Sequence, residues 1–173
     1  GYGTSKALDN PYFFDSMAIF AKQEKKRSAV IFNNGLHGWH LSEGEYERLY
    51  EEFLNKLLKE FYDIPVIPVL TTFVTNCDYH NDRVIDRNEI VKKVAYAKGL
   101  DIIDLYTVSE SNKSLLYYDG VHFTDNGYEV LAKEVLDYIF DNDLLDSSYF
   151  LNVNISFLVG LGYVKSQKRC NIN

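Results

Sequence analysis

Short apolar runs along the chain alternate with longer segments in which apolar residues recur every three or four positions. This alternation predicts buried strands separated by amphipathic helices. The apolar runs lie at 29–32, 64–70 and 101–106, and the helical patterns lie at 10–23, 42–61, 83–97 and 124–139. Helices between successive strands imply right-handed crossovers. The chain is therefore predicted to form an α/β fold of three layers, α/β/α, around a parallel sheet.

Local signals mark the ends of several of these elements. Ser42 and Glu45 have the spacing of a capping box, and Thr124 can cap the last helix. Gly99 is suited to end the helix at 83–97. Pro68 predicts either a strand end or a less central place for the second strand. The inward faces of the helices are predicted to carry Tyr46, Leu49, Tyr50, Phe53, Leu54, Leu57, Leu58, Phe61, Ile90, Val91, Val94, Ala95, Tyr128, Leu131, Ala132, Val135 and Ile139.

Two polar loops, at 33–40 and 117–124, are the candidates for a functional site. The first follows the apolar run at 29–32, and the second directly precedes the last helix. In parallel sheets, ligands bind beyond the carboxyl ends of the strands. Both loops are predicted to lie at that edge, so the sequence favours one site built from both.

The second of these loops contains Asp119 and His122, three residues apart. A catalytic histidine needs a carboxylate on one ring nitrogen while the other nitrogen faces the substrate. Gly120 gives the backbone the freedom to bring the two side chains together within one turn. The same residues also fit an ordinary Asp-Gly turn in front of a helix, so the sequence leaves both interpretations open.

Composition narrows the classes of partner. The 173 residues suit one domain with a substantial core, and the net charge of -7 argues against a nucleic-acid partner. The apolar runs are too short to span a membrane. Cys77 and Cys170 form no paired motif, which favours free thiols in a reducing, cytoplasmic compartment. The start at Gly1 without a methionine leaves a removed signal peptide open.

Two segments resemble motifs of the SGNH, or GDSL-like, hydrolases: Asp-Gly-Val-His at 119–122 before a helix, and Asn-Asn-Gly-Leu-His at 33–37 after a strand. The resemblance covers about 4–139. It implies a flavodoxin-like parallel sheet, with His122 as the catalytic base and Asp119 as the acid that orients it.

The segment at 33–37 matches its motif in part. Gly35 takes the place of the family's glycine, His37 stands where the oxyanion-hole Asn would be, and Gly38 replaces the family's Asp. An imidazole N–H can donate to an oxyanion as an amide can. The resemblance therefore implies that His37 keeps the oxyanion role.

The family's first motif, Gly-Asp-Ser, is absent from the sequence. Because that motif carries the nucleophile, the resemblance implies a serine esterase for acyl or acetyl esters whose nucleophile is not identifiable in this chain. It also implies that the first strand is lacking. Gly3 is expected to correspond to the glycine of the second motif, whose N–H helps to bind the oxyanion. Ser5 is the serine nearest the expected edge, but it lacks the Gly-Asp context.

The resemblance further implies a small-molecule ester substrate and no cofactor or metal. Asn34 and Trp39 are expected to contact the substrate. The SGNH-like domain is expected at 1–143, followed by an extension at 144–173 with no assigned role. A parallel sheet that lacks one strand would expose apolar side chains and unpaired backbone groups. We therefore expect either a homo-oligomer or a covering of that surface by the apolar segment at 153–164.

Three alternatives stay open. A non-catalytic SGNH-like domain could bind a ligand through its aromatic side chains. Arg83 and Arg87 could bind a substrate carboxylate or form solvated ion pairs of little energetic value. Metal-dependent hydrolysis would use a different set of residues, which lacks a helix-borne ligand pattern. That set is His37, His40, His80, Asp119 and His122.

Overall fold

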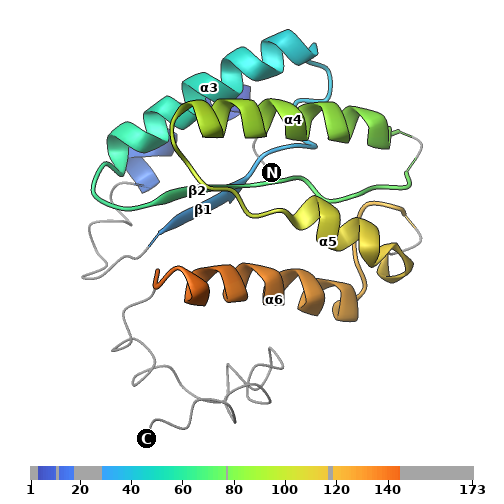
Figure 1. Cartoon of the computed structure of the whole chain (residues 1–173). Helices are drawn as coiled ribbons and strands as arrows, with labels where there is room; N and C mark the ends of the chain where they lie inside the picture. The colour runs from blue at the N-terminus through green and yellow to red at the C-terminus, as the bar shows by residue number, and fades with distance from the viewer. Residues whose placement is uncertain (1–3, 11, 18–28, 77, 117–118, 145–173) are drawn as a thin grey trace, which may run out of the picture.

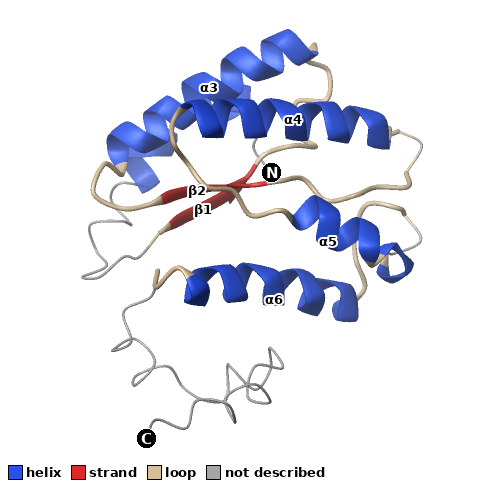
Figure 2. Ribbon diagram, viewed as in Figure 1, coloured by secondary structure: helices blue, strands red, loops and turns tan. Residues whose placement is uncertain are grey.

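The computed structural model describes residues 4–10, 12–17, 29–76, 78–116 and 119–144. Figure 2 shows helices arranged around a short sheet. In chain order the elements are α1 (Thr4–Asp9), β1 (Val30–Asn33), α3 (Glu43–Glu60), β2 (Val66–Val69), α4 (Asn81–Ala97), α5 (Leu105–Ser111), η1 (Lys113–Leu115) and α6 (Asp125–Asp141). Gly3 lies outside the described residues, and so does all of the predicted extension at 144–173 except residue 144, including the segment at 153–164.

The sheet is parallel, as predicted. β1 pairs with β2 so that Val30 lies opposite Val66 and Asn33 lies opposite Val69. Val69 also forms a parallel bridge with Ile103, on the other side of β2. Among the described residues β2 is therefore the middle segment, which explains why all its residues are buried, while β1 has three half-buried residues and the exposed Asn33. Of the two alternatives for Pro68, the less central strand is wrong for this part of the chain, whereas Pro68 does lie close to the end of β2.

The prediction of a third strand at 101–106 is wrong, because its pairing with β2 is limited to a single bridge at Ile103. The N–H of Ile103 donates to the carbonyl of Pro68, and the N–H of Leu70 donates to the carbonyl of Ile103. The next bond of this parallel ladder needs an N–H at Pro68, which proline lacks. On the other side, the Asp104 side chain accepts a hydrogen bond from the Thr107 N–H and starts α5. The residues after Asp104 are therefore helical, as α5 and η1.

Successive residues of the strands point to opposite faces of the sheet, and each face has its own apolar cluster. Val66 and Leu70 pack with residues of α3 and α4, whereas Ile67 and Val69 pack with Val135 of α6. Figure 1 shows α3 and α4 on one side of the strands and α6 on the other. The predicted three layers are therefore confirmed.

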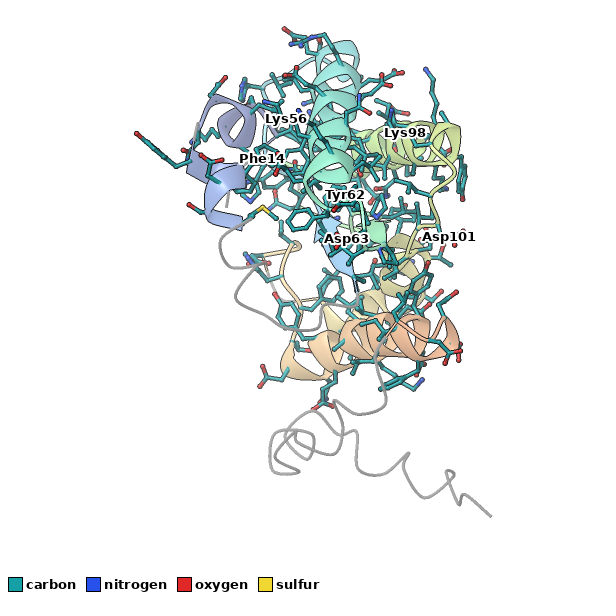
Figure 3. The ribbon with its side chains drawn as sticks, turned by 90° about the vertical axis from the view of Figure 1, so that its left-hand side faces the viewer. Phe14, Lys56, Tyr62, Asp63, Lys98 and Asp101 are labelled. Atoms are coloured by element: carbon teal, nitrogen blue, oxygen red, sulfur yellow. The ribbon has the colours of Figure 1, made fainter. Side chains whose placement is uncertain are left out.

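Local helix signals are mostly confirmed. Ser42 and Glu45 form a complete capping box at the start of α3, and Thr124 caps α6. Tyr128, however, is 48% exposed, so its predicted place on the buried face of α6 is wrong. The first predicted helix is described at 12–17, where Phe14 packs against Phe53 of α3 with ring centroids 5.5 Å apart. Figure 3 shows Phe14 beside α3.

Candidate functional site

The loops that follow the strands gather at one edge of the sheet. β1 leads into the loop at 34–41, and β2 leads into the segment at 70–80. Figure 1 shows both connections on the right-hand side, together with the start of α6. The two predicted site loops therefore lie at the same edge, with the segment at 70–80 between them.

Asp119 and His122 form the contact expected of a catalytic pair. His122 Nδ1 lies 2.7 Å from Asp119 Oδ2, while the His122 side chain is 69% exposed. Asp119 Oδ1 accepts hydrogen bonds from the backbone N–H groups of His122 and Val121. These bonds, followed by the one from the His122 ring, lower the pKa of Asp119 to about 2. The carboxylate is therefore ionised and fixed in orientation at neutral pH.

The turn that carries this pair is attached to the segment after β2. The backbone N–H groups of Thr75 and Asn76 donate to the carbonyl of Gly120, and Asn76 Nδ2 donates to the carbonyl of Asp119. Gly120 has a φ of +70°, and a Cβ there would lie 2.6 Å from the backbone nitrogen of Asn76. Only glycine suits this left-handed position and this close approach.

The segment from Thr71 to Asn76 is itself held by side chains from α4 and α5. Asn88 accepts from the Thr71 N–H at 2.8 Å and donates to the Thr71 carbonyl at 2.9 Å. Ser109 Oγ accepts from the N–H of Phe73. Extended backbone outside a ladder needs such partners when it is buried, because orphaned polar groups cost free energy.

The loop at 34–41 is held by α4 as well. The guanidinium of Arg87 donates to the carbonyls of Gly35 and Gly38 at 2.9 and 3.1 Å, and its Nε donates to Glu43 at 3.1 Å. Its side chain is 1% exposed. The expectation of solvated ion pairs is therefore wrong for Arg87. Because these contacts use most of the N–H donors of Arg87, few donors remain to bind a substrate carboxylate.

Trp39 lies against the same cations. The guanidinium carbons of Arg83 and Arg87 lie 4.6 and 4.7 Å from the centre of a Trp39 ring. Tyr79 meets Trp39 edge to face at 5.3 Å, so the loop at 34–41 contacts the segment that also carries Asn76. This contact connects the two predicted halves of the site.

Two other predicted site residues, His37 and Asn34, differ in how far they are buried. His37 is exposed at the surface of its loop. Asn34 is buried, and its backbone carbonyl accepts a hydrogen bond from the Tyr46 hydroxyl. The predictions that Asn34 and Trp39 contact a substrate, and that His37 binds an oxyanion, stay predictions.

Sequence reasoning missed the roles of Asn76, Arg87 and Asn88. A signal for two of them was present: Arg87 and Asn88 follow Val84 by three and four residues, and Val91 follows them at the same spacing. That spacing places polar side chains on the buried face of a helix, where they need partners. Asn76 lies in a polar loop and carried no such signal.

Two further features of the described residues bear on the alternatives. No group of three or more His, Cys, Asp and Glu in this part of the chain is arranged to hold a metal ion. None of the helices described here is both long and apolar enough to cross a bilayer.

No protein-family model matches the sequence, and no curated protein matches it significantly. Solved structures match the fold. The lipase/acylhydrolase from Enterococcus faecalis is 18% identical over 80% of this chain and 70% of its own, with a TM-score of 0.63. A lipolytic G-D-S-L family member from Veillonella parvula is 16% identical over 79% and 74%, with a TM-score of 0.61. A carbohydrate esterase family 3 protein from Talaromyces cellulolyticus is 15% identical over 81% and 67%, with a TM-score of 0.64. The chain therefore has the α/β fold of the SGNH, or GDSL-like, hydrolases.

Proposed function

We propose that this protein hydrolyses small acyl or acetyl esters by serine-esterase chemistry, with His122 as the general base and Asp119 as the carboxylate that orients it. The observation that carries the proposal is the 2.7 Å contact between His122 Nδ1 and Asp119 Oδ2 on an exposed turn. This contact leaves the other ring nitrogen, Nε2, for a serine hydroxyl. The likeness in fold to structures named as lipases and carbohydrate esterases supports the same chemistry.

In the proposed reaction His122 Nε2 takes the serine proton while the serine oxygen attacks the ester carbonyl carbon. The tetrahedral oxyanion accepts hydrogen bonds from the Gly3 N–H and the His37 side chain. His122 then gives the proton to the departing alkoxide. In the second half His122 takes a proton from water as the water oxygen attacks the acyl carbon, and it returns that proton to the serine oxygen as the free acid leaves. Asn34 and Trp39 contribute to the substrate-binding surface.

The pair is tested by hydrolysis of 4-nitrophenyl acetate. His122→Ala should lower kcat/KM by about 10²–10⁴-fold, the usual contribution of a positioned general base. Asp119→Asn should also lower it, because the imidazole loses the charge that holds its tautomer. His80→Ala is the matched control, since His80 is exposed and makes no side-chain capping bond at the start of α4. Equal activity in His122→Ala and His80→Ala would contradict the proposal.

The nucleophile is tested by intact mass after reaction with a fluorophosphonate probe. An adduct that is absent in His122→Ala would support a serine activated by His122. Ser5, which lies half-buried in α1, is tested by Ser5→Ala. An unlabelled wild-type chain that still binds acetylated sugars would favour the non-catalytic ligand-binding alternative.

A further inference from the structure

The buried guanidinium of Arg87 is hydrogen-bonded to the backbone of the loop that carries His37. It donates to the carbonyls of Gly35, Gly38 and Leu41, at 2.9, 3.1 and 3.3 Å. With the bond from Nε to Glu43, these four contacts use four of the five N–H donors of a guanidinium. Arg87 therefore fixes the backbone on both sides of His37.

The same contacts set the direction of the peptide dipoles in this loop. No cis peptide bond is present among the described residues, so each N–H points away from the carbonyl of its own peptide unit. The carbonyl oxygens of Gly35 and Gly38 face Arg87. These oxygens would repel an anion if they faced it, and Arg87 keeps them turned inward.

Aromatic and acidic neighbours keep the guanidinium in place. It lies 4.4 Å from the centre of the Tyr46 ring and 4.7 Å from a Trp39 ring, and its charge is paired with Glu43. Burial lowers the pKa of Arg87, whereas the bond to Glu43 raises it. A guanidinium stays protonated in proteins, so the loop is held by a permanent charge.

We propose that Arg87 is a positioning residue, which holds the loop at 35–41 so that His37 meets the oxyanion that forms when the serine activated by His122 attacks the ester carbonyl. This inference rests on the proposed function. In this role Arg87 acts through the backbone of Gly35 and Gly38.

Trp39 provides a direct readout of the loop, because it is the single tryptophan of the sequence and lies against Arg87. Acrylamide quenching of its fluorescence should increase in Arg87→Lys and in Arg87→Met, since neither side chain can serve Glu43 and the loop carbonyls together. Arg48→Met is the matched control, because the Arg48 side chain is 66% exposed on α3. It should leave quenching unchanged.

A second experiment measures kcat and KM of ester hydrolysis separately for the Arg87 variants. A displaced loop should lower kcat on the order of 10²-fold, as misplacement of about 1 Å can do, with a much smaller change in KM. Arg87→Lys serves if Arg87→Met does not fold, and thermal unfolding of each variant reports this. Unchanged quenching in a folded Arg87 variant, or unchanged kcat with increased quenching, would overturn the inference. If the wild type itself hydrolyses no ester, the proposed function is overturned instead. The quenching comparison then still tests whether Arg87 fixes the loop.

Discussion

Gly120→Ala tests whether the Asp119–His122 turn depends on its close approach to the segment after β2. Gly120 has a φ of +70°, where a Cβ costs about 1–2 kcal/mol. The added Cβ would also lie 2.6 Å from both the Asn76 nitrogen and Thr75 Oγ1, which requires the two segments to separate. Overpacking of this kind costs about 1–3 kcal/mol. The expected loss in free energy of unfolding is therefore about 2–5 kcal/mol.

Gly99→Ala supplies the matched control. Gly99 has nearly the same φ, +68°, but a Cβ there would meet nothing within 4 Å. Its substitution should cost only the backbone contribution, about 1–2 kcal/mol. Urea unfolding of wild type and both variants gives the difference, and ester hydrolysis should fall only in Gly120→Ala. A Gly120→Ala variant no less stable than Gly99→Ala would refute the steric argument.

Three other measurements follow from the described contacts. Asn88→Ala should lower the free energy of unfolding by about 2–4 kcal/mol in urea titrations, because it leaves the buried N–H and C=O of Thr71 unpaired; a cost below about 1 kcal/mol would contradict this. The pKa of Asp119 is lowered to about 2 in the fold, so its contribution to stability is present above its unfolded pKa of about 3.9 and is lost as pH falls toward 2. Between about pH 4 and 2 wild type should lose more stability than Asp119→Asn, and parallel pH profiles would count against this linkage. Thr124→Ala should cost about 1 kcal/mol by thermal unfolding through loss of the cap to Gly127, while an unchanged midpoint would mean that water replaces the cap.

Features that depend on local sequence were predictable. The capping box of Ser42 and Glu45 and the apolar stripe of α3 involve residues within a few turns of one another, and both are present. The parallel sheet followed from the alternation of helices and strands, because crossover connections constrain topology. The Asp119–His122 contact also lies within one turn, so its partners were visible in the sequence.

Features that depend on pairing across the fold were not predictable. The strand expected at 101–106 is interrupted because Pro68, more than thirty residues earlier, lacks the N–H that the ladder needs. The spacing of α4 places Arg87 on the buried face of the helix, but its partners are carbonyls of a loop about fifty residues earlier, and the spacing does not identify them. In both cases the deciding partner lies far along the chain.

Both halves of the candidate site are hydrogen-bonded to the same helix, α4. Its Asn88 fixes Thr71, at the start of the segment to which the Asp119–His122 turn is hydrogen-bonded, and its Arg87 fixes the loop with His37. An insertion of one residue between Asn81 and Arg87 would rotate the later side chains by about 100° relative to the helix start. Directed evolution of this scaffold should therefore tolerate exchange on the outer face of α4, whereas transplanting the site would require this helix together with the loops.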